Sequence, residues 1–178
     1  MFIWLLVPVR QIGEKHFYFF LVGISGDITT LVARLYFHSS TNFFVVLFLI
    51  FAFISLFERK LIEKRKIIIL ISIVILMLVE MTTSYKLNVI LIEVINIFIL
   101  IAFLADLILQ YTTKRMFPIP LALLVLYELT VVTKYITLIT EYKNAYPYFI
   151  LASIFEAFIG LFFCIFKEDD HRINIQLK

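Results

Sequence analysis

One apolar stretch, residues 121–142, constrains the fold most strongly because it is long enough to cross a lipid bilayer. A helix of about 20 mostly apolar residues spans the hydrocarbon core. The stretch nevertheless contains two ionisable side chains, Glu128 and Lys134. Ionisable groups at membrane depth are costly, so they should face the protein interior or water and have partners there. The stretch therefore predicts a membrane helix whose ionisable groups meet other helices.

The composition extends this prediction to the whole chain. The 178 residues are 63% hydrophobic and 16% charged, whereas soluble domains are about 45–50% apolar and about 25% charged. A chain this apolar cannot cover itself with a surface compatible with water, so lipid must be its solvent. We therefore predict an all-α, polytopic integral membrane protein with a single transmembrane helical domain over residues 1–178.

The apolar runs predict a bundle of about six transmembrane helices joined by short loops. Pro118 and Pro147 fall in the first turns of the last two runs, where the missing N–H of proline does no harm. The second run is short and must tilt little or borrow residues from its flanks. The predicted spans are 17–37, 43–57, 67–84, 87–110, 118–140 and 147–166.

Both chain ends lie outside these spans. The apolar run at residues 2–8 is too short to cross a bilayer. We expect the segment 1–15 to be interfacial or to extend the first helix, and Trp4 suits a membrane interface. The residues at 167–178 form a short cytoplasmic tail, too short to fold alone.

The distribution of basic residues predicts the orientation. Of the 16 Lys and Arg residues, Arg34 and Lys134 lie within spans and only Lys86 and Lys143 fall on the outer side when the N-terminus is cytoplasmic. Cytoplasmic loops carry an excess of Lys and Arg. We therefore expect a multi-pass protein of the plasma membrane, the inner membrane of a bacterium, with both termini in the cytoplasm.

Three acidic residues, Asp27, Glu128 and Glu156, form a candidate intramembrane polar site. Each lies about ten residues into its span, and a helix rises about 1.5 Å per residue, so all three should lie near the midplane. No cation is expected at that depth, and we therefore expect some of the three to be protonated. The alternative is that they hold helices together as hydrogen-bonding groups. We expect Glu128 and Glu156 to be near each other, because their spans are consecutive.

A second group of charged residues is expected closer to the outer surface. Arg34, Glu80, Glu93 and Lys134 should share the outer third of the membrane. Two cations and two carboxylates make a neutral set, which a buried network needs. We predict that Arg34 or Lys134 pairs with Glu80 or Glu93, directly or through water.

No sequence motif indicates catalysis, a cofactor or a metal site. His16, His38 and His171 are isolated near span ends, and there is no phosphate-binding loop. Residues 23–27 read Gly-Ile-Ser-Gly-Asp, whereas intramembrane aspartyl proteases use Gly-x-Gly-Asp. The mixed basic cluster at 58–66 suits contact with anionic lipid rather than with nucleic acid. We expect a protein that is not an enzyme.

Two functions remain open at this point. The first is an accessory subunit or sensor module of a larger membrane complex, whose partners are the lipid bilayer and other membrane subunits. The second is a proton-coupled carrier or channel for a small solute, in which the midplane carboxylates bind the proton or a small polar ligand. The spans lack the paired Gly/Pro breaks of discontinuous transporter helices, which argues against the second.

Overall fold

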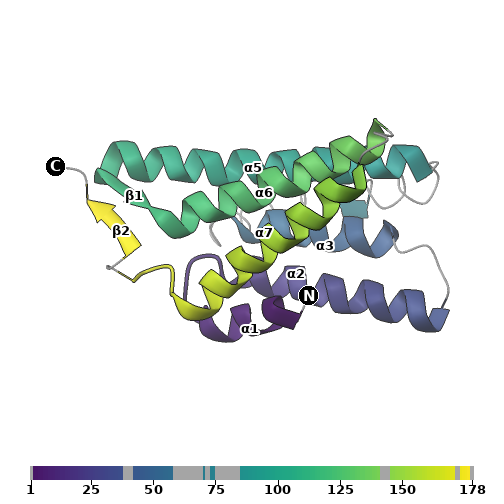
Figure 1. The fold of residues 1–178 in the computed structure, drawn as a ribbon, viewed down its shortest axis with the longest axis horizontal. Coiled ribbons are helices and arrows are strands. Elements are labelled where there is room, and N and C mark those ends of the chain that lie inside the picture. The colour runs from purple at the N-terminus through teal and green to yellow at the C-terminus, as the bar shows by residue number, and fades with distance from the viewer. Residues whose placement is uncertain are drawn as a thin grey trace.

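Helices form nearly all of the structure, a computed structural model that describes residues 2–37, 42–57, 70, 73–74, 85–140, 145–170 and 173–176. The helices are α1 (Phe2–Arg10), α2 (Phe17–Val32), α3 (Asn42–Ser55), α5 (Tyr85–Lys114), α6 (Ile119–Ile139) and α7 (Ala145–Ile165) (Figure 1). A π-helix, η1 (Ala33–Phe37), continues α2, and two short strands are β1 (Met116–Pro118) and β2 (Asn174–Gln176).

Four helical segments are long and apolar enough to cross a membrane. They correspond to the first, fourth, fifth and sixth predicted spans, so the predicted helix type is confirmed there. Predicted and observed boundaries differ by a few residues at most, because caps and frayed turns are poorly marked in apolar sequence. The four segments are Phe17–Tyr36, Leu87–Lys114, Ile119–Ile139 and Ala145–Ile165.

The second and third predicted spans have different outcomes. Residues 43–57 are largely helical as expected, but α3 has only 14 residues and is shorter than a full membrane span. The third predicted span, 67–84, lies almost entirely outside the described residues. The count of six spans therefore stays a prediction.

The helices pack as a bundle in which α5 is the central element. Helix α5 packs against α6 and α3, α2 packs against α3, and α6 packs against α7. Phe103 and Ile99 on α5, Leu124 on α6 and Phe163 on α7 are essentially inaccessible and form the core. A Cβ added at Gly26 of α2 would lie 2.8 Å from the Cβ of Phe48 on α3, so the absence of a side chain there permits the close approach of these two helices.

One end of the bundle, here called the strand end, contains β1, β2 and the turn at residues 11–16 (Figure 1). β1 and β2 are antiparallel, with Met116 opposite Gln176 and Pro118 opposite Asn174. This pairing ties the polar tail to the α5–α6 connection. Neither strand is predicted from the sequence, because three residues are too few to show an alternating pattern.

The short helix α1 lies against α7 and α2 rather than extending either of them. The turn at 11–16 separates α1 from α2, so of the two alternatives for segment 1–15 the extension of the first helix is not formed, and the interfacial position stays a prediction. A Cβ at Gly160 of α7 would lie 3.1 Å from the Trp4 ring, so the absence of a side chain there allows α1 to pack closely against α7. Helix α1 thus fills the space between α2 and α7 over part of their length.

Candidate functional site

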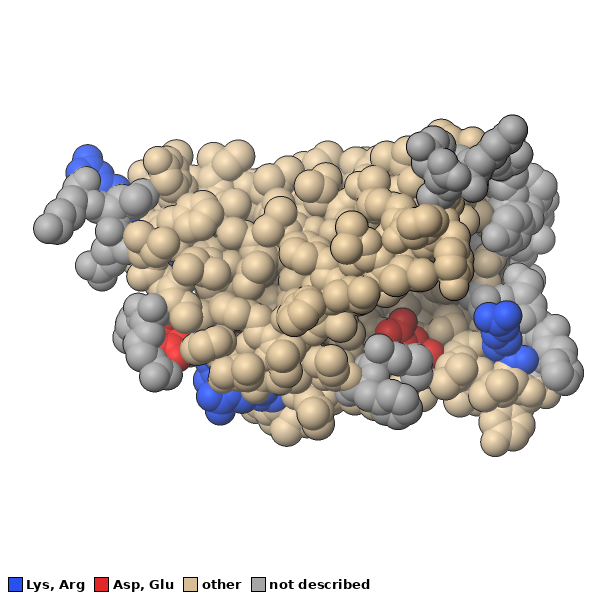
Figure 2. Space-filling model, in the orientation of Figure 1, with Lys and Arg blue, Asp and Glu red and all other residues tan. Residues whose placement is uncertain are grey.

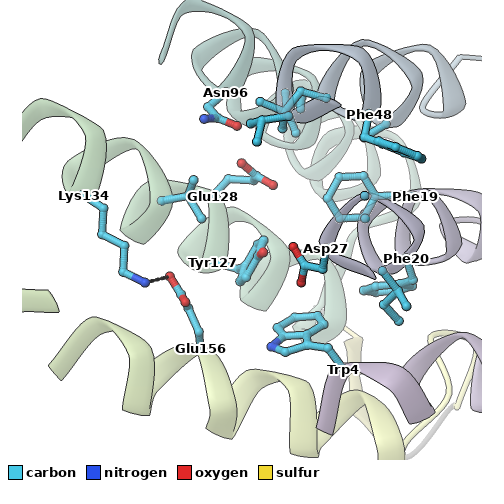
Figure 3. A pocket seen from close by; sticks show the side chains of 18 of the residues that line it. Trp4, Phe19, Phe20, Asp27, Phe48, Asn96, Tyr127, Glu128, Lys134 and Glu156 are labelled. Atoms are coloured by element: carbon cyan, nitrogen blue, oxygen red, sulfur yellow. Dashed lines mark ion pairs between the residues drawn. The ribbon is translucent and has the colours of Figure 1, made fainter. Parts of the chain in front are cut away.

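A cavity of about 500 Å³ lies in the middle of the bundle (Figure 3). Its walls come from α1, α2, α3, α5, α6 and α7, so segments from both ends of the sequence meet there. Volumes of about 300–1,000 Å³ are typical of sites that bind small molecules. The cavity is therefore large enough to hold a small organic solute.

The three acids of the predicted midplane site all line this cavity. Asp27 comes from α2, Glu128 from α6 and Glu156 from α7. The prediction that Glu128 and Glu156 are near each other is consistent with their shared cavity. Residue counting placed the three acids at one depth, and the helix packing places them around one space (Figure 3).

Lys134 also reaches this cavity, contrary to the expected position in an outer layer. Its Nζ lies 2.7 Å from Oε1 of Glu156 and 3.4 Å from the hydroxyl of Ser153. Helical side chains point back toward the N-terminus of their helix. Because α6 and α7 are antiparallel, Lys134 and Glu156 lean toward each other, and the cavity therefore contains one cation that depth counting did not predict.

Glu128 has a buried carboxyl oxygen that no donor satisfies. Only 3% of the residue is exposed, and Oε2 has no hydrogen-bond partner among the described residues. Asn96 on α5 faces the same cavity, is 1% exposed, and its Nδ2 also lacks a partner in the described part of the chain. Most buried polar atoms in proteins have a partner, so such atoms need an explanation. A polar ligand in the cavity would supply hydrogen-bond partners for such atoms.

Asp27 is the exposed member of the three acids. It lines the cavity but also reaches the surface, so the cavity is open on this side of α2. Acidic side chains are visible within a hollow of an otherwise largely apolar face (Figure 2). The cavity thus combines a buried carboxyl at its inner wall with an accessible carboxyl at its mouth.

Aromatic rings form the wall nearest the strand end. The Trp4 ring centroid lies 4.9 Å from that of Tyr127 and 6.3 Å from that of Phe20. Phe19 and Phe48 also line the cavity. Carboxyl groups surrounded by aromatic faces are suited to a cation, which aromatic faces and carboxylates both attract.

The predicted outer ion-pair network is not formed by the described residues. Glu93 is 5% exposed, and neither of its carboxyl oxygens has a partner there. Arg34 is exposed and makes no ion pair with a described acid, while Lys134 pairs with Glu156 instead. Glu80 lies outside the described residues. Direct pairing of Arg34 or Lys134 with Glu93 is therefore absent, and pairing with Glu80 or through water stays a prediction.

A separate polar cluster holds the strand end together. His16 was expected to be isolated, but its Nδ1 lies 3.0 Å from Glu168, and its Nε2 lies 3.9 Å from Asp106. Lys15 Nζ lies 2.5 Å from the same Asp106 oxygen. The cluster joins the turn after α1 to α5 and to the tail. Sequence reasoning missed it because its members are far apart in the chain.

Gln11 and Glu14 add to this cluster. Gln11 is fully buried, and its Nε2 donates to the carbonyl oxygens of Phe163 and Phe166, each at 2.7 Å. Those carbonyls belong to the last turn of α7 and its continuation, where helices leave acceptors unsatisfied. Burial and the nearby Asp169 raise the pKa of the Glu14 carboxyl, although Lys167, 3.6 Å away, opposes the shift.

The described residues contain no cluster of three or more histidine, cysteine, aspartate or glutamate side chains arranged to hold a metal ion. No family model matches the sequence, and no curated protein or solved structure matches it either. The geometry of the cavity is therefore the basis on which a function is assigned below.

Proposed function

We propose that the protein is a non-enzymatic, multi-pass membrane protein that binds a small cationic or polar solute in its central cavity and carries it, with protons, across the bilayer. The observation that carries this proposal is the convergence of Asp27, Glu128 and Glu156 on one cavity. Intramembrane ionisable groups that meet around an internal space are characteristic of ion and proton pathways.

The charge balance of the cavity supports this function. Lys134 is held by Glu156, and no described lysine or arginine forms an ion pair with Asp27 or Glu128. Three carboxyl groups in a low-dielectric space cannot all remain ionised unless a cation enters. Proton release and cation entry are therefore coupled at this site.

The proposed orientation places the strand end in the cytoplasm. Five described basic residues lie at that end, in keeping with the excess of basic residues in cytoplasmic loops. These basic residues are Arg10, Lys15, Lys114, Arg115 and Lys167. Reporter fusions at residue 178 and in the connection between α6 and α7 should give opposite readings.

Uptake into reconstituted vesicles tests the function. We expect a pH gradient to drive accumulation of methylammonium, a small cation, into vesicles that contain the protein. Glu128→Gln keeps the shape of the neutral acid and should abolish this uptake without loss of folded protein. Uptake by both Glu128→Gln and Glu156→Gln at the wild-type rate would contradict the carrier function.

A second function, an accessory subunit of a larger membrane complex, is supported by the gap between α2 and α7. These helices touch near the strand end, where the rings of Phe20 and Phe163 lie 5.0 Å apart, and they make few other direct contacts. Helix α1 contacts both of them at that end. A helix of another subunit could occupy the remainder. Extraction in mild detergent should then yield a discrete larger assembly, whereas a monomer or homodimer would contradict this function.

A further inference from the structure

We propose that the ligand of the cavity is a lipophilic organic amine, and that it enters from the side of the bundle between α2 and α7. This inference rests on the proposed function, because it names the class of solute that the cavity binds. It follows from the lining, the unsatisfied carboxyl oxygen of Glu128 and the position of the opening.

The lining favours an organic body over a bare inorganic ion. Much of the wall is apolar or aromatic, including Trp4, Phe19, Phe20 and Phe48. An inorganic cation needs several oxygen ligands, whereas the acidic groups here come from different helices and form no metal-binding cluster among the described residues. A hydrophobic body would fill the aromatic part of the 500 Å³ cavity and displace water from it.

The polar atoms define where the charged group lies. Glu128 Oε2 is buried and lacks a donor among the described residues. A protonated amine has N–H donors and a positive charge, and it would satisfy this oxygen with a charge-assisted hydrogen bond. The rings of Trp4 and Tyr127, which lie beside Asp27 in the same cavity (Figure 3), would contact the organic body of the ligand. Lys134 is occupied by Glu156 and does not compete for Glu128 at hydrogen-bond distance.

The position of the opening indicates the route. α1 closes the α2–α7 gap near the strand end, where it contacts both helices. Farther along, Asp27 is exposed at the mouth of the cavity. The hollow that contains acidic side chains opens on the flank of the bundle (Figure 2). In a bilayer this flank faces lipid, from which an amphiphilic amine can enter.

Trp4 provides a direct measurement because it is the single tryptophan of the chain and lines the cavity. The protein in lipid nanodiscs is titrated with phenylbutylamine, and Trp4 fluorescence is recorded. The neutral analogue phenylbutanol and the small cation methylammonium are titrated in parallel. We expect the amine to bind at least about tenfold more tightly than the alcohol, since hydrogen bonds to charged groups are the stronger ones.

Three variants identify the groups responsible. Glu128→Gln should reduce the preference for the amine over the alcohol to less than about twofold. The matched control is Glu93→Gln, which changes a similarly buried acid of α5 that has no partner among the described residues and does not line the cavity. It should keep the wild-type preference. Gly23→Phe should block binding of both organic probes, because a Cβ at Gly23 meets open space in the cavity wall.

The outcomes separate this inference from the proposed function. Equal binding of the amine and the alcohol would overturn the assignment of an amine while leaving a solute-binding cavity. A response to methylammonium that depends on Glu128, without a response to phenylbutylamine, would overturn the lipophilic class and retain the carrier. Full binding by Gly23→Phe would show that the organic probes bind outside this cavity and would overturn the inference. No Trp4 response to any probe would contradict the inference and remove the cavity binding on which the proposed function depends.

Discussion

The strand end and the central cavity contain the same kinds of polar groups but differ in how their principal side chains are paired, although Oε1 of Glu168 and Oδ1 of Asn174 at the strand end also lack partners among the described residues. At the strand end, His16 and Lys15 each lie against a carboxylate, and Gln11 donates to two carbonyls. In the cavity, Glu128 and Asn96 present buried atoms that lack partners among the described residues. Paired polar groups stabilise a fold, whereas unpaired ones destabilise it. The strand end is therefore held together by contacts within the chain, whereas the proposed function assigns the unpaired atoms of the cavity to a ligand.

The largest expected effect comes from removing Lys134, the cation that the described residues contribute to the cavity. Lys134→Met leaves Glu156 without its partner. Breaking a fully buried ion pair costs about 3–5 kcal/mol, and because these two side chains are partly buried we expect a loss near the lower end, about 3 kcal/mol. Glu156→Gln added to Lys134→Met should restore much of that loss. Reversible unfolding in mixed micelles measures the free energy of unfolding. Lys114→Met, at an exposed lysine, is the control and should change it by less than about 0.5 kcal/mol.

The second prediction concerns the strand end. Gln11→Leu removes the donor to Phe163 and Phe166, and an unsatisfied buried acceptor costs about 1–3 kcal/mol. The same unfolding assay measures the loss. Gln110→Leu removes only a 3.3 Å contact with Asp106 in the same helix and should cost less. Equal effects of the two variants would show that Gln11 does not anchor the turn.

The third prediction has the opposite sign. Glu128→Met replaces a buried, unsatisfied acid by an apolar side chain, so the free energy of unfolding should increase by about 0.5–2 kcal/mol. Binding of phenylbutylamine should be lost in the same variant. A variant that is more stable but no longer binds the amine would show that Glu128 serves binding at a cost in stability. A less stable variant would show that Glu128 stabilises the fold, as Gln11 does at the strand end.

The smallest effect is a dependence on pH at the strand end. The pKa of Glu14 is raised above its ordinary value of 4.5. The folded state therefore binds more protons than the unfolded state between the ordinary and the raised value, and stability falls as the pH rises through that window. Glu14→Gln should remove this slope from the thermal unfolding midpoint measured against pH. If the slope is unchanged in Glu14→Gln, another group causes the pH dependence of the unfolding midpoint.

The sequence predicted the helices and the depth of the acids more successfully than the pairing of side chains. Apolar length alone identified four spans, and a constant rise per residue placed Asp27, Glu128 and Glu156 at one level. Helix order cannot be obtained from length, so their shared cavity could not be derived. Lys134 was misplaced because the estimate used its Cα, whereas its long side chain extends about one turn toward the N-terminus of α6.

Other parts of the site left weaker signals. Asn96 is a lone amide in an apolar run, and the reasoning applied to buried acids would have identified it as a polar interior group. Trp4 was assigned to an interface from its residue type, but the absence of a side chain at Gly160 leaves room for its ring in the cavity wall. The ion pairs of His16 and Lys15 depend on long-range packing, which no local pattern encodes.

The position of α1 has a consequence for biosynthesis. Arg10 and Gln11 contact α7 residues more than 150 positions later in the chain. Membrane proteins are made from the N-terminus, at about 5–20 residues per second. Helix α1 is therefore synthesised before α7 and can pack only against α2 until α7 has been made. In the meantime the donors of Arg10 and Gln11 lack the carbonyl oxygens that they meet in the complete fold.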